Sequence, residues 1–389
     1  MTVVVVGGGP SGLLAAWSAS KRGVDVLVLE EHSRIGVPVH CAGLLSASGL
    51  RRIGVQPSPR FVQNRVRGAH FYSPSGLTFT VEKPETVAYV VDRAEFDSSL
   101  ADKAVNSGVH IQFKAMVRGI RRSGGRLTVS WAGGSLEAPL VVDAEGVRSR
   151  LVMQMGLKTI DWRRVLPAAQ VELSGVDVDG EYVEVHLGRR VAPKFFAWVI
   201  PLDGSTARVG LACGGVSPVR MLRQFVRRRF GRGIPAKCGA GCVLTCGPIP
   251  RTYADNFLVV GDAAGQVKPT TGGGVITGGI CAITAGEVAA DAAMNGIYSS
   301  SRLRRYEEAW RDKLGGEFRW MMRARRLLDS TPDRLVDEVF KRITSLGLDE
   351  ELSTIGDMDL QAASITQLTR RLALRAPTTL VKLLLRLIF

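Results

Sequence analysis

The sequence predicts an α/β fold, in which a domain built on a parallel sheet carries an inserted antiparallel β-sheet domain and is followed by a C-terminal helical region. A β-branched run at 3–6 leads directly into a glycine-rich turn and a helical segment, as in a parallel βα unit. Runs with strand composition cluster between 165 and 213. Beyond residue 300 apolar residues recur with helical period. These three observations define the predicted layout.

Length and composition restrict the class of protein. The chain has 389 residues, which suits two or three domains, and 46% hydrophobic with 22% charged residues is a globular composition. The formal net charge of +15 favours anionic partners such as nucleotide phosphates, phospholipid headgroups or nucleic acid. No nucleic-acid recognition motif accompanies the charge, so we expect no nucleic-acid partner.

Cysteine usage and hydropathy predict a cytoplasmic protein. Six cysteines in a chain of this length do not form a disulfide framework. The apolar N-terminal run has no basic segment before it and is broken by glycines, so we expect a buried strand and not a signal peptide. No uninterrupted apolar stretch of about 18 residues is present, so no transmembrane helix is predicted.

The first βα unit carries a dinucleotide-binding pattern. The strand Val3–Val6 is followed by Gly7, Gly9 and Gly12 in the spacing G-x-G-x-x-G, and then by the helical segment 13–21. Gly7 permits the tight turn, Gly9 lets the backbone approach a pyrophosphate, and Gly12 lets helix and strand pack closely. The pyrophosphate would lie at the helix N-terminus, where free N–H groups favour negative charge.

An acidic residue ends the next predicted strand. Glu30 follows the apolar run 24–29, where a carboxylate accepts hydrogen bonds from an adenosine ribose. The carboxylate would repel a 2′-phosphate and therefore disfavours NADP. In this context the glycine pattern is a specific signal for a dinucleotide.

A second glycine-rich element indicates FAD in place of NAD. A strand that ends at Val260 is followed by Asp262 and then by Gly272, Gly273 and Gly274 before another helical stretch. An FAD site uses such an element, because the acid can bind the ribityl or pyrophosphate region. The glycines let backbone N–H groups approach the isoalloxazine ring and stabilise charge on reduced flavin.

Together these motifs resemble the glutathione-reductase-type FAD family in its hydroxylase-like branch. The segment 141–150 is similar to that family's D-G-x-x-S-x-x-R motif with a shifted register. Asp92-Arg93, with Phe96-Asp97, resembles an Asp-Arg pair of this branch, and the resemblance implies that Arg93 reaches the flavin. It also implies a Rossmann-type FAD-binding domain and FAD as cofactor.

The predicted antiparallel sheet contains a sequence motif that resembles the signature of a particular family. Its expected strands are Val165–Leu173, Glu181–Leu187, Phe195–Pro201 and Arg208–Cys213. The run 193–201 with Val209-Gly210 is similar to the P-x-x-Y-x-W-x-F-P…G-x-G signature of geranylgeranyl reductases. Phe196 stands for the Tyr, Ile200 for the second Phe and Ala212 for the last Gly. The aromatic residues 195, 196 and 198 would also suit ordinary core packing.

The loop 38–46 resembles the archaeal geranylgeranyl reductases, in which a Cys lies near the flavin. The chain thus looks like the archaeal digeranylgeranylglycerophospholipid reductases, which saturate the isoprenoid chains of membrane ether lipids. The resemblance implies Cys41, Phe196 and Trp198 as catalytic-site residues, with Cys41 as pocket wall or proton relay. His40 is the alternative proton donor, and a small buried residue is the plain alternative for Cys41.

Two other functions share these FAD motifs. A flavin monooxygenase or halogenase is one, although the halogenase motif W-x-W-x-I-P is absent from the sequence. An electron-transfer dehydrogenase that reduces a quinone is the other, although it would carry an added cluster domain. The cysteines at 238, 242 and 246 do not have zinc or cluster spacing, so no metal is expected. NAD(P)H and reduced ferredoxin both stay open as electron donors, and the expected substrate is a prenylated glycerophospholipid.

The predicted domains are discontinuous. The FAD-binding domain comprises 1–66, 88–150 and 252–300; the substrate domain comprises 67–87 and 151–251; the helical region is 301–389. Helices are expected at Leu303–Leu328, Pro332–Leu346 and Asp359–Leu374. The apolar, basic segment 378–389 is too short to span a membrane; it would lie in the membrane interface or dock on the protein. The expected location is the cytoplasm, with peripheral contact at the inner face of the cell membrane.

Overall fold

A computed structural model describes residues 3–235, 238–362 and 366. At its centre lies a six-stranded sheet in the order β18-β19-β12-β1-β2-β8, and every neighbouring pair is parallel except β18–β19. Its strands are β1 (Val3–Val6), β2 (Val26–Leu29), β8 (His110–Gln112), β12 (Leu140–Asp143), β18 (Tyr253–Ala254) and β19 (Phe257–Val259). All residues of β1 and β12 are buried, because both faces of the sheet are covered.

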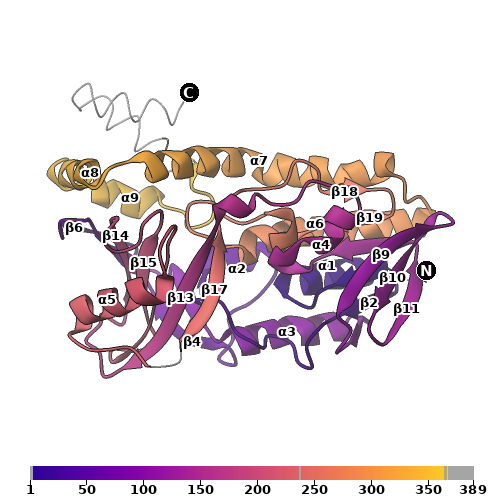
Figure 1. The fold of residues 1–389 in the computed structure, drawn as a ribbon, viewed down its shortest axis with the longest axis horizontal. Coiled ribbons are helices and arrows are strands. Elements are labelled where there is room, and N and C mark those ends of the chain that lie inside the picture. The colour runs from indigo at the N-terminus through magenta and orange to yellow at the C-terminus, as the bar shows by residue number, and fades with distance from the viewer. Residues whose placement is uncertain (1–2, 236–237, 363–365, 367–389) are drawn as a thin grey trace.

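Helices cover one face of this sheet and a small sheet covers the other (Figure 1). The helices are α1 (Pro10–Ser20), α3 (Arg93–Val105) and α6 (Val275–Asn295), packed on the side of Val3 and Val5. On the side of Val4 and Val6 lie β9 (Val117–Ser123), β10 (Arg126–Trp131) and β11 (Gly134–Ala138). Successive side chains of β1 therefore pack into two separate hydrophobic cores, one on each face of the sheet.

Helix α6 is the one described helix that is long and apolar enough to cross a membrane by length and composition. Two-thirds (67%) of its apolar window is buried inside the protein. It packs closely on α1, since a Cβ at Gly286 would lie 2.3 Å from the carbonyl oxygen of Ala15. These contacts are those of a core helix.

The second large sheet has seven strands in the order β17-β13-β16-β15-β14-β5-β6. They are β5 (Gly68–Tyr72), β6 (Thr78–Glu82), β13 (Val165–Ser174), β14 (Tyr182–Leu187), β15 (Phe196–Pro201), β16 (Thr206–Ala212) and β17 (Gly239–Leu244). Pairing is antiparallel except between β14 and β5, where it is parallel. The predicted antiparallel sheet is confirmed, with this one exception.

One face of the seven-stranded sheet is covered by α5 (Pro218–Phe230), which the sequence analysis missed. The small sheet of β3 (Leu44–Ser46), β7 (Ala88–Val91) and β4 (Val62–Val66) is a further element, and the short helices α2 (Ala47–Arg52) and α4 (Arg150–Gln154) pack in the two cores of the six-stranded sheet. The sheet's other face is turned toward the six-stranded sheet, and the functional site lies between the two.

The C-terminal helical region is confirmed for its first two helices. They are α7 (Ser300–Ser330) and α8 (Asp333–Ser345), and α9 (Leu348–Ile355) follows them. The helix expected to begin at Asp359 is wrong at its start, because 356–361 is irregular and the third helix lies before it. The rest of that expected helix, apart from residues 362 and 366, and the segment 378–389 lie outside the described residues.

Candidate active site

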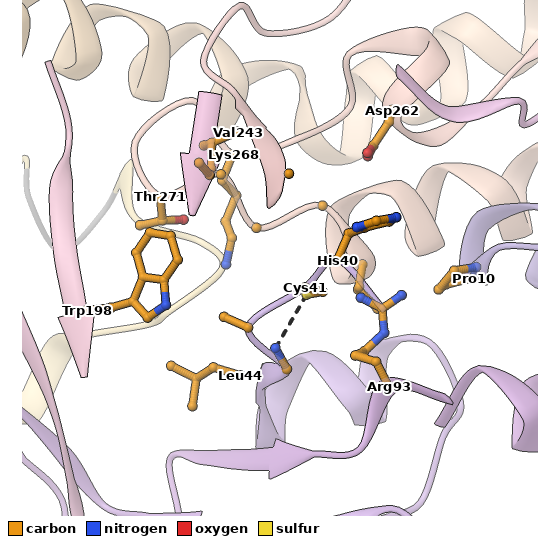
Figure 2. A pocket seen from close by; sticks show the side chains of 18 of the residues that line it. Pro10, His40, Cys41, Leu44, Arg93, Trp198, Val243, Asp262, Lys268 and Thr271 are labelled. Carbon is orange, nitrogen blue, oxygen red and sulfur yellow. Dashed lines mark hydrogen bonds between the residues drawn. The ribbon is translucent and has the colours of Figure 1, made fainter. Parts of the chain in front are cut away.

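A single cavity of about 1360 Å³ runs from the glycine turn after β1 to the exposed face of the seven-stranded sheet. Most sites for one small molecule occupy roughly 300–1,000 Å³. The cavity therefore has room for a dinucleotide and a second, apolar ligand. Figure 2 shows the middle of this cavity, where residues from both sheets meet.

The glycine turn forms one end of the cavity. A Cβ at Gly12 would lie 1.9 Å from the carbonyl oxygen of Gly7, and a Cβ at Gly7, whose φ is +101°, would lie 2.4 Å from that of Ala144. A Cβ at Gly9 would meet nothing within 4 Å. Gly9 is the N-cap of α1 and provides no side-chain cap, so the first N–H groups of the helix face open space. The turn has the form of an anion-binding site.

Glu30 holds this turn in shape. Its Oε2 accepts a 2.6 Å hydrogen bond from the backbone N–H of Gly8, and its Oε1 accepts a 2.9 Å bond from that of His32. The His32 ring Nδ1 lies 2.6 Å from the same Oε1. An ionised carboxylate can accept about four hydrogen bonds, so Glu30 retains capacity for a ribose hydroxyl. Its role toward ribose stays a prediction.

Asp262 points into the cavity from the end of the central sheet (Figure 2). Its side chain is exposed, yet it has no hydrogen-bond partner among the described residues. The carboxyl opens only into the cavity, where the surrounding protein limits its hydration and raises its pKa, and the nearby charge of Arg93 opposes the shift. A carboxylate that is exposed to the cavity and has no partner among the described residues is available to a donor group of a ligand.

The loop 272–274 lies directly beside Asp262. A Cβ at Gly274 would lie 2.9 Å from Asp262 Oδ1, and one at Gly272, whose φ is +73°, would lie 2.3 Å from Val243. Gly274 is also the N-cap of α6 and has no side-chain cap. A second helix N-terminus is thus directed at the cavity, close to its middle.

Arg93 and Asp97 form a buried pair on the first turns of α3. Nε and Nη2 of the guanidinium donate to the two carboxylate oxygens at 2.9 Å each. Burial raises the pKa of Asp97, and the charge of Arg93 opposes this shift. Arg93 lies in the wall of the cavity near Cys41 (Figure 2).

Cys41 lies in the middle of the cavity wall, on the loop before β3. Its Sγ accepts a 3.4 Å hydrogen bond from the backbone N–H of Gly43 and is partly exposed (Figure 2). His40, the alternative proton donor, has its Nδ1 3.0 Å from the carbonyl oxygen of Ala240 on the edge strand β17. The structure thus brings Cys41, Arg93 and Asp262 to one cavity.

An aromatic wall forms the sheet side of the cavity. Phe195 and Phe196 stack with centroids 4.2 Å apart, and Phe196 meets Trp198 edge to face at 6.2 Å. Trp198 donates from Nε1 to Gln170 Oε1 at 3.1 Å, which satisfies its polar atom. Phe196 and Trp198 both line the cavity because they are two residues apart on β15.

The far end of the cavity is apolar and includes residues that the sequence analysis did not predict. Helices α7, α8 and α9 contribute Trp320, Ala324, Leu327, Leu328, Ile343 and Leu352. In the sequence these residues show only the apolar periodicity of a helix, which is the same for a cavity wall and for an ordinary core.

A buried ion pair joins the loop before α6 to the segment that follows α9. Lys268 Nζ donates to Asp359 Oδ1 at 2.6 Å and to the carbonyl oxygen of Met358 at 3.0 Å. The two charged side chains are only 5% and 2% exposed. Ser46 donates to the other oxygen of Asp359. Lys268 also lines the cavity beside Gly273, and no motif in the sequence marked it.

The three cysteines spaced four residues apart do not share one element. Cys242 lies in β17 and lines the cavity, whereas Cys238 and Cys246 lie outside that strand. Among the described residues, no group of His, Cys, Asp and Glu is placed to hold a metal ion.

The site fits FAD on three structural grounds. The N-termini of α1 and α6 present uncapped N–H groups to the cavity, Gly9 leaves open space for a pyrophosphate, and Asp262 offers an unpartnered carboxylate between them. The family model for the FAD binding domain matches residues 1–215. The fold and site therefore define an FAD-binding flavoprotein.

The similar proteins refine this class. Digeranylgeranylglycerophospholipid reductase 2 of Methanothermobacter thermautotrophicus is 36% identical over 92% of this chain and 94% of its own length. The digeranylgeranylglycerophospholipid reductase of Methanocaldococcus jannaschii is 33% identical over 86% of this chain and 88% of its own length. The chain belongs to the digeranylgeranylglycerophospholipid reductase family.

Solved structures agree with this assignment. A geranylgeranyl bacteriochlorophyll reductase-like protein from Thermoplasma acidophilum matches over 99% of both chains, with a TM-score of 0.88 and 26% identity. A flavin-dependent brominase matches with a TM-score of 0.70 at 19% identity, which shows a shared fold alone.

Proposed function

We propose that this protein is an FAD-dependent reductase that hydrogenates isolated C=C bonds of geranylgeranyl chains in archaeal-type ether glycerophospholipids. The observation that carries the proposal is the single cavity, whose one end suits FAD and whose other end is apolar and aromatic. The names of the related reductases support the same substrate class. The halogenase alternative has support from fold alone.

Each part of the cavity has a task in this reaction. FAD, once reduced, supplies a hydride equivalent at N5 for one alkene carbon. Gly9, Asp262 and the loop 272–274 would hold the cofactor, with Glu30 toward its ribose. Phe196 and Trp198 would hold the prenyl chain in place and exclude water, which confines the chain to a reactive position.

The second alkene carbon requires a proton. Cys41 is the proposed source, because its thiol lies in the cavity wall between the flavin side and the aromatic wall (Figure 2). The backbone N–H of Gly43, which donates to Sγ at 3.4 Å, would keep the thiol in position. The proton on Sγ would pass to the carbon, and solvent would restore it.

An anaerobic reaction tests the function. The purified holoenzyme is reduced with dithionite and mixed with a geranylgeranylated glycerophospholipid. Reoxidation of the flavin, with a product heavier by two hydrogens per double bond, supports the reductase. Flavin that stays reduced until air is admitted, followed by rapid oxygen consumption, would instead favour a monooxygenase. NAD(P)H and reduced ferredoxin can be compared as donors in the same assay.

Replacing Cys41 with alanine is expected to leave FAD bound and to lower kcat by about 10²-fold, the usual contribution of a positioned general acid. Single-turnover reoxidation of the reduced variant by the lipid measures this step. Cys242→Ala is the matched control, because Cys242 lines the same cavity from β17. An equal loss of rate in both variants, or no loss of rate in Cys41→Ala, would show that Cys41 is not the proton donor.

We also propose peripheral contact with the inner face of the cytoplasmic membrane. The lipid substrate, the net charge of +15 and the apolar, basic segment 378–389 support it. Deleting 378–389 is expected to lower flotation with anionic vesicles, while turnover of detergent-dispersed substrate persists. Unchanged flotation would contradict the contribution of this segment.

A further inference from the structure

Arg208 is a charged residue in the interior of the seven-stranded sheet. It lies on β16 and is 7% exposed. Its neighbours Ala207 and Val209 belong to the core beneath α5, so Arg208 points to the opposite face of the sheet. Gly210, two residues on, lies under the Trp198 ring on that same face. Arg208 therefore belongs to the face that carries the aromatic wall, although it does not line the cavity.

The guanidinium binds four separate chain segments. Nη1 donates to the carbonyl oxygens of Val91 at 2.9 Å and Ala42 at 3.2 Å. Nη2 donates to Gln63 Oε1, and Nε donates to Glu172 Oε1 at 2.7 Å. A planar fork with five N–H donors can bind all of these acceptors at once, which an ammonium cannot do.

The two carbonyl groups adjoin the central residues of the site. Ala42 follows Cys41, and Val91 precedes Asp92-Arg93. The loop closes directly on the guanidinium, since a Cβ at Gly43 would lie 2.4 Å from the Val91 oxygen and 2.6 Å from Arg208 Nη1. Arg208 thus fixes the chain beside each of the two side chains that meet at the cavity.

The partner carboxylate does not explain why this charge is buried. The Glu172 side chain is 57% exposed, and an ion pair with one solvated member contributes little to stability. Burying a guanidinium costs more than such a pair returns, unless its other hydrogen bonds are made. The carbonyl oxygens of Ala42 and Val91 accept both bonds of Nη1, and Gln63 accepts that of Nη2, so the Cys41 loop, the end of β7 and β4 supply the main interactions of the guanidinium.

We propose that Arg208 is a positioning residue, which holds the Cys41 loop and the start of α3 in register with the aromatic wall of the substrate sheet. Through it the proton-donating side and the chain-binding side of the cavity keep a fixed separation. This role rests on the proposed function for its catalytic consequence, whereas its structural consequence at Cys41 does not require a lipid.

The test compares Arg208→Gln and Arg208→Lys holoenzymes with Arg223→Gln, an exposed arginine on α5. Arg208→Gln is expected to retain FAD, to label at Cys41 several times faster with iodoacetamide by peptide mass analysis, and to show an altered visible circular dichroism of the flavin. With substrate, kcat should fall about 10²-fold, as for a misplacement near 1 Å, with KM little changed. Arg208→Lys should fall between wild type and Arg208→Gln.

Wild-type labelling at Cys41 and a wild-type flavin spectrum in Arg208→Gln would overturn the proposal. If Arg208→Gln does not fold, the folded Arg208→Lys variant decides. Wild-type labelling of Cys41 and a wild-type kcat in that variant would also overturn the proposal, because Arg208 would then contribute to stability alone. Labelling and the flavin spectrum need no substrate. If Arg208→Gln changes the labelling of Cys41 but the wild-type protein reduces no alkene, the positioning role of Arg208 is supported and the proposed function is refuted. The two proposals can therefore fail separately.

Discussion

A Gly9→Ala protein is expected to fold normally and to be purified without FAD. The backbone of Gly9, at φ −74° and ψ 175°, is an ordinary extended conformation, and its Cβ would meet no protein atom within 4 Å. The added methyl group would instead occupy the space in which the pyrophosphate approaches the backbone of α1. The ratio of flavin to protein absorbance measures retention, and far-UV circular dichroism reports the fold.

Two further glycine variants complete this experiment. Gly12→Ala is expected to damage the fold itself, because its Cβ would lie 1.9 Å from a backbone oxygen. Gly316→Ala, on the exposed side of α7 with nothing within 4 Å, should keep FAD and gain up to about 1 kcal/mol of helix stability. A yellow Gly9→Ala protein with the wild-type absorbance ratio would refute the placement of the pyrophosphate.

The second large effect is expected at Asp359. Replacement by asparagine leaves the Lys268 ammonium buried without its anion, and loss of one member of a buried pair costs about 3–5 kcal/mol. The free energy of unfolding in urea measures this loss. The control is Glu308→Gln, whose partner Arg304 is 64% exposed, so about 1 kcal/mol or less is expected.

A double variant distinguishes the buried charge from simple packing. Lys268→Met combined with Asp359→Leu removes both charges and should recover part of the stability lost in Asp359→Asn. A loss below about 1 kcal/mol in Asp359→Asn would show that the pair is open to water and does not fasten the loop.

The nucleotide half of the fold was predictable because its constraints are local. The turn Gly7–Gly12 and Asp262 follow strands whose buried apolar runs are unmistakable in sequence. Phe196 and Trp198 were predictable from a resemblance and lie on one face, as their spacing of two requires. Their catalytic roles stay predictions until the variants are measured.

The remainder depends on contacts between distant segments. Lys268 and Asp359 are 91 residues apart, and neither lies in a pattern that marks it for burial. Arg208 looks in sequence like a solvent-facing residue of a strand. Helix α5 was missed because its arginines suggest a charged surface, although Met221, Leu222, Phe225 and Val226 form a regular apolar stripe.

The fastening of Lys268 to Asp359 also sets an order of events during synthesis. The glycine turn, the antiparallel sheet and the loop 268–274 leave the ribosome well before residues 357–361, which complete the cavity wall. Domains fold from the N-terminus as the chain emerges, so we expect a chain that has not yet reached residue 357 to hold an open apolar cavity and a lysine without its carboxylate. The cavity wall is therefore completed by a segment that is synthesised long after the turn and the sheet that form the rest of the site.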